Sequence, residues 1–219
     1  MRELTKFKNI PIMIGSNTLR LLLIAVGLFL VFNGLVATIS FLILISLILF
    51  SIVAHELGHA FCARAFGYDT KRVVITPLGG YAQINVEDFE GTEAEYYISA
   101  AGPFVNFAIA GMLIPFAFFS VEHTRYLMML NAAIALFNLI PAYPLDGGRM
   151  LRCLLTKKFG VVDGTIISCK VSYVLSLFIV ALGLYSGSLI IGFLAVITGA
   201  YIYLHCRSEE KRFEERKWK

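Results

Sequence analysis

The chain has 219 residues, of which 58% are hydrophobic and only 16% are charged, and its formal net charge is +4. An ordinary soluble domain is about 45–50% apolar and about 25% charged, so this composition excludes that class and indicates a surface that faces lipid. The basic residues form short clusters beside apolar runs and make no basic face with interleaved aromatics, so nucleic acid is not an expected partner.

Apolar stretches predict an α-helical integral membrane protein with about six transmembrane helices. In chain order they cover about residues 19–32, 39–65, 98–119, 126–140, 166–185 and 189–205. The first run leads into more membrane sequence without a small-residue cleavage site, so we do not expect a cleaved signal peptide. We interpret residues 1–206 as one transmembrane domain.

Lys and Arg residues cluster before the first apolar stretch and after the second, fourth and sixth, whereas the other connections carry almost none. Because cytosolic loops are enriched in basic residues, this asymmetry predicts a multi-pass protein of the cell membrane with both termini in the cytosol. Residues 207–219 form a charged cytosolic tail, which we expect to extend the last helix.

Residues 71–87 differ from the apolar helical stretches, because β-branched and aromatic residues flank Gly79 and Gly80. This pattern is typical of a β-hairpin with the two glycines at its turn. Residues 9–14 (NIPIMI) also alternate and are candidates to pair with it. The sequence therefore predicts a small β-sheet at the cytosolic membrane boundary.

The second apolar stretch ends in a zinc-site motif, HELGH at residues 55–59. Residues four apart lie on one face of a helix, so His55 and His59 can point at one metal ion. Glu56 is then placed to act as the general base on a metal-bound water. A lone HExxH can arise by chance, but three ionisable groups within five residues at membrane depth need a common partner.

A catalytic zinc site takes three protein ligands plus water, so a third ligand must come from elsewhere in the chain. His123 is expected on the opposite side of the membrane, His205 is better interpreted as a surface or interface residue, and Cys62 as a small hydrophobic one. Asp146, in the segment NLIPAYPLDGGR, lies at the cytosolic end of the fourth stretch. Prolines stop the helix there, although such a segment could also be an ordinary loop leaving the membrane.

HELGH in one apolar stretch together with NLIPAYPLDGGR in a later one resembles the site-2 protease family of intramembrane zinc metalloproteases. The segments AGPFVN (101–106) and PLGG (77–80) also resemble family segments. The resemblance implies one Zn²⁺ per chain held by His55, His59 and Asp146, with Glu56 as general base. Asn138 matches a position implied to steady the substrate or the oxyanion.

Within the family, the compact arrangement resembles the stage IV sporulation protease branch and its small archaeal relatives. No PDZ or cystathionine-synthase-like domain is expected in this chain. The resemblance implies hydrolysis of a peptide bond in or near a transmembrane segment of a membrane protein, in regulated intramembrane proteolysis. Implied partners are the lipid bilayer, membrane-bound regulators and a membrane-tethered transcription or sigma factor as substrate.

Two alternatives remain open from the sequence. The first is a zinc-binding membrane protein without proteolytic activity, although zinc binding alone has no need of Glu56. The second is an ion transporter that uses His and Asp side chains as a pathway. Transporters often carry paired broken helices in two related halves, and the sequence has one clear interruption of this kind.

Overall fold

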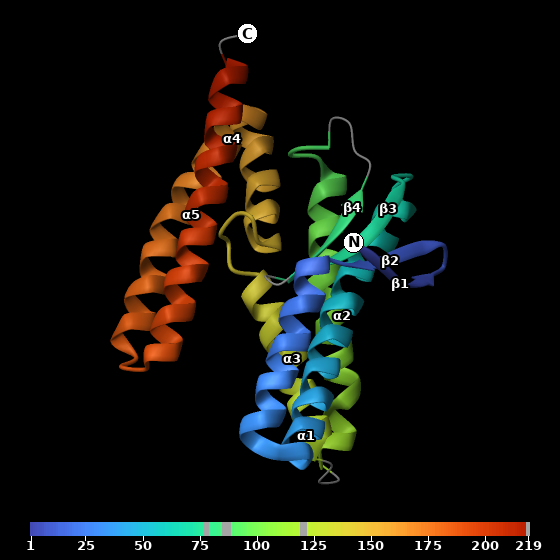
Figure 1. Cartoon of the computed structure of the whole chain (residues 1–219). Coiled ribbons are helices and arrows are strands. Elements are labelled where there is room, and N and C mark those ends of the chain that lie inside the picture. The colour runs from blue at the N-terminus through green and yellow to red at the C-terminus, as the bar shows by residue number, and fades with distance from the viewer. Residues whose placement is uncertain (77–78, 85–88, 119–121, 218–219) are drawn as a thin grey trace. The chain divides into compact units, whose positions relative to one another are not determined.

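The computed structural model describes residues 1–76, 79–84, 89–118 and 122–217, which contain four strands and five helices (Figure 1). These residues form two compact units. The first comprises Met1–Glu87 and Ala101–Ala135, and the second comprises Asp88–Ala100 and Leu136–Lys219. Helices α2 (Glu93–Phe118) and α3 (Glu122–Asn138) each contribute residues to both units.

The first unit contains the predicted small sheet, whose strand order is β1-β2-β3-β4. Its strands are β1 (Arg2–Phe7), β2 (Ile10–Ile14), β3 (Thr70–Thr76) and β4 (Gly79–Ile84). The predicted pairing of the NIPIMI segment is confirmed: β2 runs parallel to β3, with Ile12 opposite Val73. The hairpin of β3 and β4 is also confirmed, but Gly79 and Gly80 begin β4 rather than form the turn. Residues 77 and 78 of the PLGG segment lie outside the described residues.

Alternation along β2 buries Ile10, Ile12 and Ile14 on one face of the sheet. Ile10 packs with Ala60 and Val73, which anchors the sheet on the end of α1 that carries the HELGH motif. Each buried aliphatic side chain contributes about 1.5–3 kcal/mol relative to an exposed one, so this contact fixes the sheet beside the motif.

Helix α1 (Ser16–Ala65) includes two of the predicted spans, residues 19–32 and 39–65. It breaks at Gly34, whose φ of 77° and ψ of 177° lie in a region that is essentially restricted to glycine. Phe29 and Phe41, on opposite sides of the break, stack with ring centroids 4.4 Å apart. The chain therefore reverses at Gly34, and the two arms of α1 run side by side (Figure 1).

The second unit is dominated by α4 (Asp146–Tyr185) and α5 (Leu189–Lys217). Helix α4 also breaks at a glycine, Gly160, with φ 80° and ψ 167°. Small residues let α4 and α5 pack closely, since a Cβ at Gly199 would overlap Val180. Helix α5 continues through residues 207–217, so the tail is helical as predicted.

Four helices in the described residues are long and apolar enough to cross a membrane: α1, α2, α4 and α5. The predicted count of six transmembrane helices is therefore wrong. Residues 19–32 and 39–65 form the two arms of a single element, α1, and α3 has only 17 residues, whereas a crossing needs about 20.

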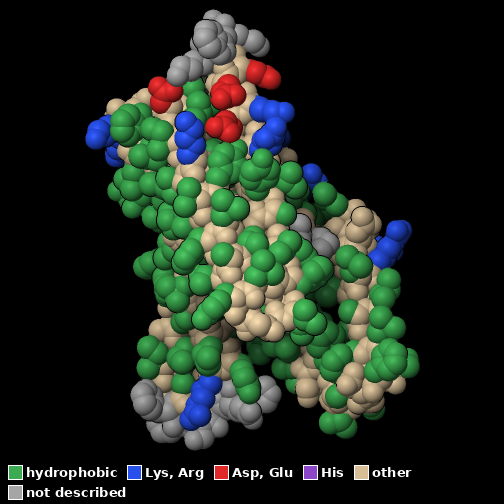
Figure 2. Space-filling view, turned by 90° about the vertical axis from the view of Figure 1, so that its left-hand side faces the viewer, with side chains coloured by type: hydrophobic (Ala, Val, Ile, Leu, Met, Phe, Trp, Pro, Cys, Tyr) green, Lys and Arg blue, Asp and Glu red, His purple; other side chains and the backbone are tan. Residues whose placement is uncertain are grey.

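Large apolar side chains on these helices are strongly exposed, among them Phe32 (80%), Val36 (81%) and Leu189 (92%). Figure 2 shows hydrophobic side chains over most of one face, with most of the visible charged side chains toward one end of it. Contiguous apolar surface of this extent is unfavourable in water. The chain is a membrane protein, as its composition predicts.

Candidate metal centre

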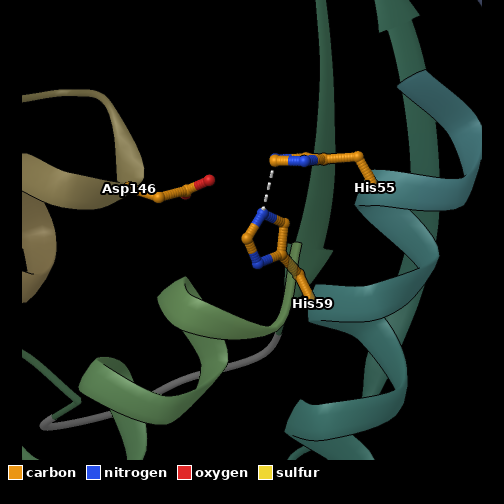
Figure 3. A group of neighbouring side chains, drawn as sticks. All are labelled: His55, His59 and Asp146. Atoms are coloured by element: carbon orange, nitrogen blue, oxygen red, sulfur yellow. Dashed lines mark hydrogen bonds between the residues drawn. The ribbon is translucent and has the colours of Figure 1, made fainter. Parts of the chain in front are cut away.

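Helix α1 brings the two motif histidines together in the first unit. His55 and His59 are one helical turn apart, and their Nε2 atoms lie 3.1 Å from each other (Figure 3). Both side chains are buried, with exposed fractions of 5% and 8%. A buried pair of imidazoles on one helix thus has its Nε2 atoms close together, as the spacing of the motif predicts.

This nitrogen pair fits zinc. Zn–N bonds are about 2.0–2.1 Å, so two nitrogens on one tetrahedral ion are about 3.3 Å apart. The observed 3.1 Å is close to that separation. Neutral imidazole is a preferred zinc donor, and the donor set of the motif therefore suits a single divalent ion of this kind.

The other nitrogen of His55 is bound by a buried amide. His55 Nδ1 lies 2.6 Å from Oδ1 of Asn106, which belongs to α2 and is the last residue of the AGPFVN segment. A metal-binding histidine ordinarily donates its second N–H to a carbonyl or carboxylate, which orients the ring. Asn106 supplies this partner from within the first unit.

Helix α2 passes very close to the two imidazoles because it carries glycine at the crossing. A Cβ built on Gly102 would lie 2.7 Å from Nε2 of His55 and would also overlap the ring of His59. One turn along α1, a Cβ on Gly58 would lie 2.8 Å from the carbonyl oxygen of Ala101. Glycine at position 102 thus permits the close packing of α2 on α1, whereas a Cβ on Gly111 would meet nothing within 4 Å.

Glu56 is buried, with an exposed fraction of 7%, and lies against the start of β4. A Cβ on Gly80 would fall 2.7 Å from Cγ of Glu56 and 3.0 Å from its Oε1. The backbone of β4 therefore runs directly beside the carboxyl group of Glu56, because residue 80 is a glycine.

Asp146 is the first residue of α4 and belongs to the second unit (Figure 3). The two glycines that follow it permit a close approach to the backbone of the preceding segment. A Cβ on Gly147 would lie 2.6 Å from the carbonyl oxygen of Ile140, and one on Gly148 would lie 2.6 Å from Cα of Tyr143. Asn138 is the last residue of α3, also in the second unit.

Three other ligand candidates were considered from the sequence: His205, Cys62 and His123. His205 is exposed on α5 and makes an edge contact with the ring of Tyr201, with centroids 4.6 Å apart, so its interpretation as a surface residue is confirmed. Cys62 is a half-buried free thiol. The side chain of His123 lies outside the described residues.

Sequence reasoning missed Ser51 and Asn131, which hydrogen-bond to each other next to Asn106. Polar residues inside apolar stretches are the signal that could have found them. All three side chains have an exposed fraction of 0%, and a buried polar group needs a partner.

Comparison with known proteins places these motifs in a family. The model of peptidase family M50 matches residues 41–124 and 120–182. The zinc metalloprotease MJ0392 of Methanocaldococcus jannaschii is 33% identical over 218 residues, which is 97% of this chain and 61% of that protein. Stage IV sporulation protein FB of Bacillus subtilis is 33% identical over 51% of this chain and 40% of its own length. The chain thus spans less than two thirds of these curated relatives.

The fold also matches a solved structure, the site-2 protease from Methanocaldococcus jannaschii. The TM-score is 0.68 at 30% sequence identity, and the match covers 95% of this chain and 94% of the other. Both halves of the resemblance found in the sequence, the HELGH stretch and the later LDGG stretch, lie within the residues that the family model matches. The chain belongs to peptidase family M50, the site-2 protease family of zinc metalloproteases.

Proposed function

We propose that this chain is an intramembrane zinc metalloprotease that hydrolyses a peptide bond in or near a transmembrane segment of a membrane protein. The observation that carries the proposal is the pair of buried imidazole nitrogens 3.1 Å apart on an apolar helix, with Glu56 in the turn between them. Buried ionisable groups at membrane depth are costly and are usually functional.

His55 and His59 hold the zinc ion in this proposal, and Asp146 supplies the third ligand. Three kinds of support favour Asp146. A carboxylate completes a common catalytic zinc donor set. The residue begins a membrane helix, and its glycine-rich surroundings give the backbone a tight turn. The family model also covers its segment together with the histidines.

A bound zinc ion supplies a water molecule of lowered pKa and polarises a carbonyl group. Glu56 accepts a proton from the attacking water and later donates it to the leaving amine nitrogen. Because Glu56 is only 7% exposed, few water molecules compete for its carboxyl group. Asn138 donates a hydrogen bond to the oxyanion or steadies the substrate, in keeping with its position eight residues before Asp146.

The substrate segment must unwind before attack, because helical hydrogen bonds occupy its backbone carbonyls. We place the unwound segment along β4, which pairs with β3 alone among the described strands. An extended peptide can add to such an edge through backbone hydrogen bonds. Gly80 favours this arrangement, since β4 passes beside the carboxyl group of Glu56 at this residue.

Both termini face the cytosol in the proposed topology. In the first unit, β2 precedes the first arm of α1 and β3 follows the second arm, and the two strands pair. The ends of this helical hairpin therefore lie on one side of the membrane. The basic residues Arg64, Lys71 and Arg72 lie at that end, which favours the cytosolic side.

The proposed substrate class is a membrane-tethered protein, such as a transcription or sigma factor released by cleavage. A similar protein bears the name stage IV sporulation protein FB, which makes a role in sporulation a specific form of this proposal. Membrane-bound regulators belong to the same proposal, as does the division into a transmembrane domain (1–206) and a charged cytosolic tail (207–219).

The decisive experiment is Glu56→Gln in the full chain, reconstituted with a membrane-tethered test substrate. Zinc content should stay at one ion per chain while cleavage falls about 10²- to 10⁴-fold, because only proton transfer is removed. Unchanged cleavage would remove Glu56 from the mechanism. A wild-type chain that binds zinc and cleaves nothing would favour the inactive zinc-binding protein, and ion flux in vesicles without proteolysis would favour a transporter.

A further inference from the structure

A chain of buried polar side chains runs from His55 away from the metal centre, entirely within the first unit. Asn106 in α2 contacts His55, Asn131 in α3 contacts Asn106, and Ser51 in α1 contacts Asn131. Ser51, Asn106 and Asn131 each have an exposed fraction of 0%. Water cannot replace a missing partner there, so the direction of every hydrogen bond matters.

The amide of Asn106 has only one orientation that satisfies its neighbours. Its Nδ2 lies 3.2 Å from the backbone oxygen of Ser51 and 2.8 Å from Oδ1 of Asn131. A carbonyl oxygen can accept but not donate, so the amide nitrogen must face Ser51. Oδ1 of Asn106 therefore faces His55 and can only accept a hydrogen from it.

Asn131 is held in the same way one step further out. Its Nδ2 donates to Oγ of Ser51 at 3.0 Å and to the backbone oxygen of Leu127 at 2.9 Å. The hydroxyl of Ser51 in turn donates to the backbone oxygen of Leu47 at 2.8 Å. Each donor in this hydrogen-bond network points at an acceptor, and Oδ1 of Asn131 therefore accepts from Nδ2 of Asn106.

This directionality determines which nitrogen of His55 carries its hydrogen. Since Oδ1 of Asn106 only accepts, Nδ1 of His55 must donate, at 2.6 Å. A neutral imidazole with its hydrogen on Nδ1 has its lone pair on Nε2. That lone pair faces the place where His59 Nε2 also points, 3.1 Å away.

We propose that Ser51 and Asn131 are positioning residues, which act through Asn106 to hold His55 in the tautomer that binds the metal through Nε2. The inference rests on the proposed zinc site and adds to its ligands a hydrogen-bond relay made of Asn106, Asn131 and Ser51. Ser51 lies one helical turn before His55, and Asn131 ties α3 to both α1 and α2. The packing of three helices thereby determines which ring nitrogen of His55 carries the hydrogen.

A purely structural role is the rival explanation, because buried asparagines also join helices in membranes. Both roles predict lower thermal stability when the side chains are removed. Only the positioning role predicts a change in the tautomer of His55 in the metal-free protein. It also predicts lower zinc affinity in variants that remain folded.

The experiment uses the full chain with ¹⁵N-labelled histidine, in the metal-free state and then titrated with zinc. The variants are Asn106→Leu, Asn131→Leu and Ser51→Ala. The matched control is Ser46→Ala, since the hydroxyl of Ser46 donates to Leu42 O at 2.8 Å in the same helix but contacts no member of the relay. Wild-type and control spectra should show His55 with hydrogen on Nδ1 alone.

Asn106→Leu should give a mixture of tautomers and lower zinc affinity by about 10- to 100-fold, as for other partners of metal-binding histidines. Asn131→Leu and Ser51→Ala should each lower affinity by about threefold or more through coupling to Asn106. If Asn106→Leu does not fold, the tautomer of His55 and the zinc affinity of these two variants test the same inference. Tautomers and affinities that match the wild type in the folded variants would overturn the inference.

The two proposals can fail separately. A wild-type chain that binds no zinc would overturn the proposed metalloprotease, whereas the metal-free spectra would still decide whether the relay fixes His55. A wild-type chain that binds zinc, with variants indistinguishable from it, would leave the protease standing and overturn the relay.

Discussion

A Cβ at Gly102 would lie 2.7 Å from Nε2 of His55, so only glycine leaves the space beside this nitrogen open. Helix α2 crosses α1 at the point where the two Nε2 atoms converge. Any side chain at position 102 would occupy the space in front of the nitrogens that are proposed to bind zinc. The close approach of the two helices thus serves the metal centre as well as packing.

Gly102→Ala should lower zinc affinity by at least about tenfold, which is the effect of removing a residue that hydrogen-bonds to a metal ligand. The added methyl group forces one imidazole out of position. Isothermal titration or competition with a chromophoric chelator measures the change. Gly111→Ala is the matched control in the same helix, because a Cβ there meets nothing within 4 Å. Equal zinc affinity in the two variants would contradict the proposed position of the ion.

Asp146→Ala tests the third ligand. Removing a direct ligand should lower zinc affinity by more than about 100-fold, the upper range for residues that only support a ligand. Cleavage should fall with it and should not recover at moderate zinc concentrations. Asp163→Ala changes a second aspartate of α4 and should leave zinc binding intact. If zinc affinity survives Asp146→Ala, the third ligand lies elsewhere.

The ion pair of Glu95 and Arg152 joins α2 to α4 inside the second unit, where the two side chains are 1% and 5% exposed. Glu95 also accepts from the backbone nitrogen of Gly91 at 2.7 Å. Removing one partner of a buried pair usually costs about 3–5 kcal/mol, because the other charge is left unpaired.

Glu95→Gln should therefore lower the thermal unfolding midpoint of the detergent-solubilised protein by several degrees. Glu93→Gln breaks an exposed ion pair with Lys157, whose atoms lie 2.7 Å apart, and serves as the control. Exposed pairs contribute little, so the midpoint of this control should match the wild type. A similar midpoint for both variants would show that the buried pair has no stabilising role.

Tyr143 lies in the turn before α4 and donates its hydroxyl hydrogen to Glu209 of α5 at 3.1 Å. Burial raises the pKa of Tyr143 to about 12 from its ordinary value of 10.0, and the negative charge of Glu209 adds to this against the lowering effect of Arg149 and Arg152. The folded state therefore keeps this proton at pH values where the unfolded state has lost it.

Stability linked to Tyr143 is fully present below pH 10 and is lost as the pH rises from 10 to 12. A shift of this size corresponds to about 2–3 kcal/mol. The unfolding free energy of the wild type should fall more steeply over this interval than that of Tyr143→Phe, which has no proton to lose. Parallel pH profiles would show that the phenol is not protected in the folded state.

The sequence predicted the pairing of the two motif histidines better than the path of the chain. HELGH depends only on local helical geometry, so the convergence of His55 and His59 could be predicted from spacing alone. The alternation of β-branched residues likewise predicted strands β2, β3 and β4. The predicted count of six transmembrane helices was wrong for two reasons: α3 has only 17 residues, and the apolar runs on either side of Gly34 are the two arms of one element, α1. Hydropathy alone does not reveal such a glycine break.

By itself, the sequence determined that the chain enters a membrane and carries a zinc motif, because composition and i, i+4 spacing are local properties. Only the tertiary structure decided what surrounds that motif: Gly102 in front of the imidazoles, Gly80 beside Glu56, and the relay from Ser51 and Asn131 through Asn106. These residues are up to 80 positions apart in the chain. Their roles arise from helix packing and hydrogen-bond direction, which no local pattern encodes.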